Sequence, residues 1–362
     1  MELARWLRFA PLAAIAVLGT AGLVRPAAMA AGDRPWVPHP CPARGVGAPP
    51  GEATGTTWYR LNPVLDVHGS LTGRRLTVGA GTGAPRFLAL DPESFASGPV
   101  DGLLLVGSDD GKMSRLRLVD IRHSCAVDIA GESAVIRSAI LEPGHGAILE
   151  HRVDRSTRAD LGVWRRPLDG GTIARVLEPL GADTRFGPTF STDLRLAADG
   201  RLVVSTCGQR ACRVRVSPIG GGPVALVDGV GPALGVHGST LVTEEPCAGL
   251  PCAVLAVDLA GGERRVLVRD AGQAVLGGPG DGFLVYEDRD GGATGFDLAR
   301  DRNVPVTDER MRPVAGGSVA TTGAETPGDT LPVTRDGVVG AGLRALSFDT
   351  GAPTLVTPEE LQ

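Results

Sequence analysis

Short apolar runs separated by tight-turn residues recur along the chain after residue 57. The run 202–206 is apolar and β-branched, and after it Val214 and Val216 alternate with Arg213 and Arg215. This period of two is typical of a half-buried β-strand. Three glycines at 220–222 then turn the chain into a further apolar run at 224–227. The pattern predicts consecutive antiparallel strands joined by hairpin turns.

The same order of strand, turn, strand, glycine turn and strand occurs again at 240–268 and, earlier, at 163–177. An apolar residue stands just before each glycine-containing turn, often after an aspartate. These residues are Val67, Ile121, Leu168, Ile219, Leu259, Leu298 and Phe348. Their mean spacing is about 47 residues, which is typical of a four-stranded β-propeller blade. We therefore predict an all-β fold, a β-propeller of four-stranded antiparallel blades; seven blades are favoured, and six is the alternative because residues 31–57 contain only weak strand patterns.

One repeat resembles a known family. The stretch 199–204 (DGRLVV), followed by the strand 214–216, the turn 220–222 and Leu226-Val227, resembles the TolB-type, WD-like propeller repeat. The resemblance covers residues 86–357, is strongest over 160–270 and weakens over 272–345. It implies a propeller. Members of this class serve as periplasmic binding scaffolds or as appendages of peptidases, so the resemblance does not choose a function.

Composition supports a turn-rich β protein. Gly and Pro account for 52 and 28 of the 362 residues, which leaves few stretches able to form long helices. The net charge is −5. Such an acidic chain lacks the basic face that sequence-independent nucleic-acid binding needs, so we expect no nucleic-acid partner.

The N-terminus is typical of an export signal. Arg5 and Arg8 precede an apolar stretch at 9–24, and Ala28 and Ala30 fit a cleavage site. We predict a signal peptide at 1–30, a Pro/Gly-rich segment at 31–57, the propeller at 58–357 and a tail at 358–362. The mature chain would be secreted or extracytoplasmic, in the periplasm or cell envelope, with no membrane span after cleavage. An uncleaved N-terminal anchor is the alternative, although 16 apolar residues fall short of the usual span.

Six cysteines fit an oxidising compartment. Cys207/Cys212 and Cys247/Cys252 share the spacing C-x4-C and are offset by 40 residues, which predicts one disulfide-clamped hairpin in each of two consecutive repeats. Cys41 and Cys125 remain, and by elimination they pair. Six cysteines allow 15 connectivities, so this pairing is an inference from spacing.

Motifs that would assign chemistry are missing from the sequence. There is no G-x-S-x-G elbow and no complete phosphate loop; residues 107–112 predict a hairpin turn. His145 and His151 lie near Glu142 and Glu150, but they lack the spacing of a closed metal site. Residues 287–292 show only part of a calcium loop. We predict no catalytic residue, no metal and no cofactor.

The hairpins that join the second and third strands of each blade form the best candidate for a binding face. Two of them are disulfide-clamped, which lowers the entropy cost of ordering a binding loop. The bland alternative is that these residues are polar only because hairpin tips are exposed. The candidate binding residues are Asp109, Asp110, Asp154, Arg155, Arg158, Asp160, Arg210, Glu244, Glu245, Asp288, Arg289 and Asp290.

The sequence is compatible with two functions. The first is a monomeric, non-enzymatic scaffold that binds a protein, a peptide or a cell-wall polymer. The second is a propeller hydrolase or lyase with its site at the mouth of the central channel. The first is favoured because no catalytic motif is present.

Overall fold

The computed structural model describes most of the chain between residues 36 and 310 and three short strands beyond it. The described residues are 36–41, 57–66, 70–80, 86–100, 102–142, 144, 146–181, 191–208, 210–247, 251–272, 274–277, 281–287, 293–305, 307–310, 319–322, 344–347 and 354–357. The chain divides into two units, Met1–Arg34 and Pro35–Gln362. Because the first described residue is 36, the expected signal peptide at 1–30 lies outside the described residues.

The described strands of the second unit form seven sheets. Sheet 1 contains β2 (Thr57–Leu65), β3 (Leu71–Ala80) and β4 (Arg86–Leu90). Sheet 2 contains β5 (Phe95–Val100), β6 (Leu103–Asp109), β7 (Ser114–Asp120), β8 (Cys125–Glu132) and the short β1 (His39–Pro40). Sheet 3 contains β9 (Val135–Leu141), β10 (Ala147–Val153), β11 (Asp160–Pro167) and β12 (Ala174–Leu177).

The remaining sheets follow in chain order. Sheet 4 contains β13 (Ser191–Leu196), β14 (Arg201–Cys207), β15 (Cys212–Pro218) and β16 (Ala225–Val230). Sheet 5 contains β17 (Ala233–His237), β18 (Thr240–Glu244), β19 (Cys252–Asp258) and β20 (Arg264–Ala271). Sheet 6 contains β21 (Ala274–Gly277), β22 (Phe283–Glu287), β23 (Ala293–Asp297) and β24 (Arg302–Pro305). Sheet 7 contains β25 (Thr307–Arg310), β26 (Val319–Thr322), β27 (Arg344–Ser347) and β28 (Thr354–Thr357).

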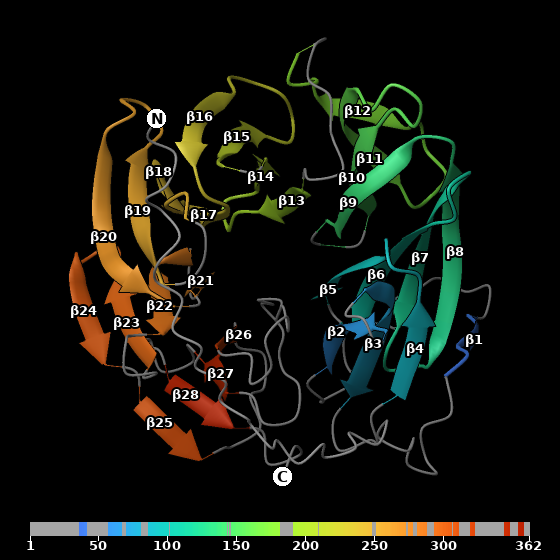
Figure 1. The fold of residues 1–362 in the computed structure, drawn as a ribbon, viewed down its shortest axis with the longest axis horizontal. Coiled ribbons are helices and arrows are strands. Elements are labelled where there is room, and N and C mark those ends of the chain that lie inside the picture. The colour runs from blue at the N-terminus through green and yellow to red at the C-terminus, as the bar shows by residue number, and fades with distance from the viewer. Residues whose placement is uncertain are drawn as a thin grey trace, which may run out of the picture. The chain divides into compact units, whose positions relative to one another are not determined.

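The fold is a β-propeller. In sheets 3 to 6 the four strands pair in chain order and antiparallel, as the repeat predicted. Successive sheets contact each other mainly through one strand of each sheet, as in β2 with β5, β5 with β9, β9 with β13, β17 with β21 and β21 with β26 (Figure 1). In sheets 1 to 6 the inner strands are β2, β5, β9, β13, β17 and β21. In sheet 7 the inner strand is β26, and β25 pairs in parallel with β28 at the opposite edge of the sheet. In sheet 2 the short β1 pairs in parallel outside β8.

The hydrophobic core lies between neighbouring sheets. Because side chains alternate along a strand, both faces of a second strand can be buried. In β6, Leu104 and Val106 pack against Leu76 of sheet 1, whereas Leu103 and Leu105 face sheet 3. All four are buried, and full burial of one such side chain stabilises the fold by about 1.5–3 kcal/mol. This explains why the second strands are nearly continuous apolar runs.

The apolar residue before each glycine turn has a defined structural role. Ile121, Leu168, Leu259 and Leu298 each follow the third strand of their sheet and pack into the core shared with the preceding sheet. Their backbone N–H groups donate to the carbonyl of the residue before the second strand, at 2.9–3.0 Å. Among the preceding aspartates, Asp258 accepts a hydrogen bond from the Gly261 N–H at 2.6 Å and so fixes the turn. Val67 and Phe348 lie outside the described residues.

All three predicted disulfides are present, and no described cysteine is free. Cys41–Cys125 attaches the N-terminal segment to sheet 2, where β1 pairs in parallel with β8. The other two disulfides close the hairpins β14–β15 and β18–β19 at equivalent places in sheets 4 and 5. The 40-residue offset in the sequence therefore reflects equivalent positions in two consecutive blades.

Candidate functional site

The hairpins between second and third strands lie at one end of the sheets, as predicted. In an antiparallel sheet this end also holds the start of each first strand, so it brings inner-strand residues beside the hairpin tips. The glycine turns at Gly170, Gly221 and Gly261 join third and fourth strands and hence lie at the opposite end. We call the end of the sheets that carries the hairpins between second and third strands the hairpin end.

Two of the candidate acids hold their own turns. Asp110 accepts hydrogen bonds from the backbone N–H groups of Lys112 and Met113 at 2.9 and 2.8 Å. Asp154 accepts from the backbone and hydroxyl groups of Ser156 and Thr157, chiefly the Thr157 N–H, and these bonds lower its pKa to about 2. Such hydrogen bonds are what make aspartate a turn residue. The sequence placed both residues at hairpin tips but did not indicate this local use.

Asp109 and Arg155 join two neighbouring hairpins. The Arg155 guanidinium donates to both carboxylate oxygens of Asp109, at 2.8 and 2.7 Å, and its Nε donates to the Ser133 carbonyl at 3.0 Å. Partial burial acts to raise the pKa of Asp109, but the hydrogen bonds from Arg155 and Ser114 outweigh it and the pKa is lowered. A bidentate pair of this kind fixes geometry as well as charge. It orients the hairpins of sheets 2 and 3 relative to each other.

Asp160 is the first residue of β11 and is buried. Its carboxylate accepts hydrogen bonds from His151 Nε2 at 2.9 Å and from the N–H groups of Gly162 and Leu180 at 2.8 and 2.7 Å. Burial opposes ionisation, yet these bonds together lower the pKa of Asp160. Arg215 of sheet 4 approaches the same carboxylate at 3.6 Å. These contacts hold the Asp160 carboxylate in the protein interior, where its partners are other residues of the fold.

The other candidates lie at the surface or outside the description. Arg158, Arg210 and Glu245 are exposed on their hairpins. Glu244 ends β18 and is half-buried. Asp288, Arg289 and Asp290 lie outside the described residues, and so does His145 of the metal hypothesis that the sequence disfavoured.

Inner strands supply charged residues that the sequence did not single out. Arg137 of β9 lies two residues from Val135, which pairs with the last residue of β10 before its hairpin. Asp193 of β13 lies two residues from Ser191, which likewise pairs with Cys207 before its hairpin. The two strands are in contact. Arg137 and Asp193 therefore occupy equivalent depths at the hairpin end of neighbouring inner strands.

Arg195 connects the inner strands of sheets 4 and 5. Its Nε donates to Asp193 Oδ2 at 2.6 Å and its Nη1 donates to the Leu234 carbonyl of β17 at 3.1 Å. The Asp193 charge raises the pKa of Arg195 against the effect of burial, and Glu244 adds to this in the same direction. We name Asp193, Arg195 and Glu244 the Arg195 cluster.

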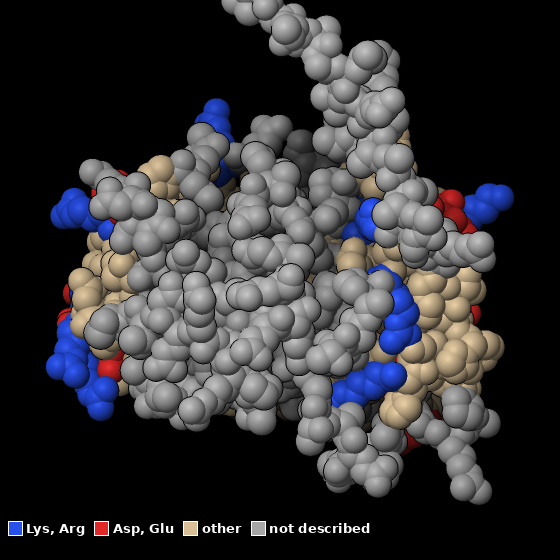
Figure 2. Space-filling model, turned by 90° about the horizontal axis from the view of Figure 1, so that it is seen from below, with Lys and Arg blue, Asp and Glu red and all other residues tan. Residues whose placement is uncertain are grey.

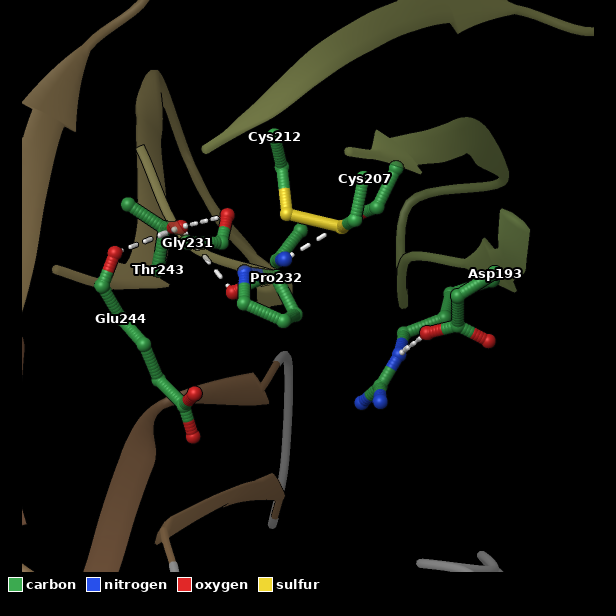
Figure 3. Close-up of a disulfide and its surroundings, with 10 residues drawn as sticks. Asp193, Cys207, Cys212, Gly231, Pro232, Thr243 and Glu244 are labelled. Atoms are coloured by element: carbon green, nitrogen blue, oxygen red, sulfur yellow. Dashed lines mark hydrogen bonds and ion pairs between the residues drawn. A yellow bond between two sulfur atoms is a disulfide. The ribbon is translucent and has the colours of Figure 1, made fainter. Parts of the chain in front are cut away.

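Glu244 is held by the segment that links sheets 4 and 5. The Gly231 N–H donates to its carbonyl at 2.7 Å, and its own N–H donates to the Pro232 carbonyl at 3.1 Å. A Cβ on Gly231 would lie 2.8 Å from that carbonyl oxygen, so only glycine permits this approach. Figure 3 shows Pro232 beside the Cys207–Cys212 disulfide, with Asp193 on one side and Glu244 on the other.

Replacing Glu244 by Gln is expected to stabilise the protein at pH 7 and to have little effect at pH 4. Burial raises the pKa of Glu244 above its value of 4.5, and the nearby Arg195 only partly offsets this. A raised carboxyl pKa contributes stability that is present below pH 4.5 and is lost as the pH rises through the folded-state pKa. Urea unfolding of both proteins at the two pH values measures the difference. Equal destabilisation at both values would contradict the assignment.

The surface carries mixed charge. Figure 2 shows small groups of Lys and Arg with Asp and Glu beside several of them, rather than one basic field, over the described residues of that face. Among the described residues, no three His, Cys, Asp or Glu side chains gather closely enough to hold a metal ion. In that same part of the chain, no helix has the length and hydropathy needed to cross a membrane.

No protein-family model matches the sequence, and no curated protein is similar to it. Similar solved structures include TolB from Acinetobacter baumannii, with 14% identity over 70% of this chain and 64% of TolB, at a TM-score of 0.45. A protein from Lactobacillus plantarum has 13% identity over 83% of this chain and 95% of its own, at 0.46. The β-propeller domain of the trilobed protease from Pyrococcus furiosus has 12% identity over 84% and 90%, at 0.44. The chain thus matches less than two thirds of TolB, and the fold assignment rests on the sheet topology above.

Proposed function

We propose that this protein is an extracytoplasmic binding scaffold that holds a peptide segment of mixed charge at the hairpin end of its inner strands. The observation that carries the proposal is the placement of opposite charges at equal depth on adjacent inner strands, with Arg137 on β9 and Asp193 on β13. Ligand sites in proteins combine a rigid frame with a few placed polar groups. Here sheets 3, 4 and 5 supply the frame.

Mixed charge favours a peptide over a polyanionic wall polymer. The Arg195 cluster holds two carboxylates to one guanidinium, and Glu93 lies exposed next to the start of β5. A polymer with a negative charge on every unit would meet these carboxylates with the same sign. A polypeptide can instead present amine, guanidinium and carboxylate groups along one segment.

The disulfides support an oxidising compartment. Three bridges in one chain are typical of extracytoplasmic proteins, because cytosolic thiols are kept reduced. Two of the bridges clamp hairpins at the hairpin end, next to the Arg195 cluster. Clamped loops lose less entropy on binding.

Selection from a random linear-peptide display library tests the proposal. We expect the purified protein to enrich peptides containing both charge signs, and we expect an Asp193→Asn, Glu244→Gln double variant to retain them at least tenfold less. The control is Arg201→Met, which changes a charge of sheet 4 at the opposite end. No enrichment, or equal retention by the double variant, would refute the proposal. Cleavage of the selected peptides would support the alternative, a hydrolase at the same place.

A further inference from the structure

Arg137 is a partly buried cation whose charge has little compensation. Its side chain is 20% exposed, and its Nε has no hydrogen-bond partner. The carboxylate of Glu93 stands 4.0 Å from its Nη1, beyond hydrogen-bond distance, and the Glu93 side chain is itself 71% exposed. Asp109, the other nearby carboxylate, already accepts two hydrogen bonds from Arg155. A charge that is largely removed from water normally has a hydrogen-bonded counter-ion.

A second arginine adds to the imbalance. Burial first, and then the positive charge of Arg158, lower the pKa of Arg137, and the acids Glu93 and Asp109 only partly oppose this. Arg158 lies in the hairpin after β10, which pairs with β9. Two guanidinium groups therefore share one region of the hairpin end.

The backbone at Arg158 is held in an unusual conformation. Its φ is +61°, in the left-handed region that glycine or asparagine usually occupies. The Arg158 N–H donates to the Asp154 carbonyl at 2.9 Å, which closes the turn. A long charged side chain at such a position costs of order 1 kcal/mol relative to glycine. Strained backbone in binding loops is a recurrent feature of functional sites.

We infer that Arg137 and Arg158 form an oxyanion subsite that binds a carboxylate group of the ligand. An oxyanion bound there would complete the hydrogen bonding of Arg137 and relieve the repulsion between the two guanidinium groups. The inference rests on the proposed peptide-binding function, and it assigns the acidic part of the peptide to sheet 3. The basic part would then lie toward Asp193 and Glu244.

The test uses acetate as a carboxylate probe and sulfate as an inorganic oxyanion, each against chloride at matched ionic strength. With arginine labelled by 15N, we expect a saturable shift of the Arg137 Nε–Hε resonance with a dissociation constant in the millimolar range. Arg158→Gly, which removes the charge and suits the left-handed backbone, should weaken acetate binding at least tenfold while the protein stays folded. Arg117→Met, which removes an exposed paired arginine of β7, should not change it.

The outcomes separate this inference from the proposed function. If Arg158→Gly leaves the acetate titration unchanged, or if the Arg137 resonance shows no saturable shift, there is no subsite. Sulfate binding without acetate binding would also overturn the inference, because a carboxylate would then not be the ligand group. Peptides enriched by the wild type but retained equally by Arg137→Met would leave the scaffold function standing without this subsite. Saturable acetate binding with no enriched peptide would support the oxyanion subsite and refute the proposed peptide-binding function.

Discussion

Replacing Glu150 by Gln is expected to lower the free energy of unfolding by about 3–5 kcal/mol. The Glu150 side chain is fully buried and accepts hydrogen bonds from Arg152, at 2.9 Å, and from Arg166. These two arginine side chains are only 10% and 12% exposed. Without the Glu150 charge they would remain buried with only the Glu132 carboxylate, which comes from the neighbouring sheet. The cost of an uncompensated buried charge exceeds the net value of the pair itself.

Urea denaturation with the disulfides intact measures this loss. Asp128→Asn is the matched control, because its pair with Arg117 is 76% and 47% exposed and should be worth at most about 1 kcal/mol. Replacing Glu150, Arg152 and Arg166 together by Met should recover most of the loss, since a buried ionic network exchanged for apolar side chains is often neutral in stability. If Glu150→Gln costs no more than Asp128→Asn, the network has no role in stability.

Removing the Cys41–Cys125 disulfide by double replacement with Ala is expected to cost up to about 4.5 kcal/mol. The bridge joins residues 84 apart in the sequence, whereas each of the other two bridges joins residues only 5 apart. In the chain-entropy account, a bridge that closes a longer loop restricts the unfolded chain more, and a five-residue loop is worth about 2 kcal/mol. We therefore expect the order of losses to follow loop length.

The structure around the Cys41–Cys125 bridge allows a second measurement of its role. The N-terminal segment is otherwise held by the short parallel pairing of β1 with β8 and by Trp36, whose N–H donates to the Phe87 carbonyl at 2.7 Å. In the double Ala variant, Trp36 should become accessible to limited proteolysis and fluorescence quenching before global unfolding. Loss of the Cys207–Cys212 bridge should leave Trp36 protected. The reverse order of losses, or unchanged Trp36 protection, would contradict the anchoring role.

The arginines at the hairpin end differ in their expected contribution to the stability of the fold. Arg155 links two hairpins through Asp109, so its replacement by Ala should destabilise the protein whether or not it contacts a ligand. Arg158 and Arg210 are exposed and can be replaced with little effect on the folded state. Binding experiments on this face are therefore most informative when they change Arg158 and leave Arg155 in place.

The sequence by itself determined the repeating architecture of this protein. Alternation of apolar and polar residues at a period of two, interrupted by glycine turns, is a local property that tertiary structure does not need to specify. It correctly placed the hairpins β14–β15 and β18–β19, and the equal cysteine spacings correctly predicted their disulfides. The apolar residues before the glycine turns were also correct markers, because each of the five that the structure describes packs into a core between two sheets.

Tertiary structure decided which charged residues meet. Asp109, Asp154 and Asp160 look alike in sequence, yet one pairs with Arg155 of another hairpin, one fixes its own turn and one is buried against His151. Arg137 lies in β9 (VIRSAIL), and Asp193 and Arg195 lie in β13 (STDLRL). No motif or turn signal in these stretches marked the three residues. Their significance depends on the contact between β9 and β13 and on the reach of Arg195 to Leu234. Hydrogen bonds and close ion pairs form only when two groups approach within a few ångströms. The distances between these residues, which are far apart in the chain, are set only once the sheets are packed.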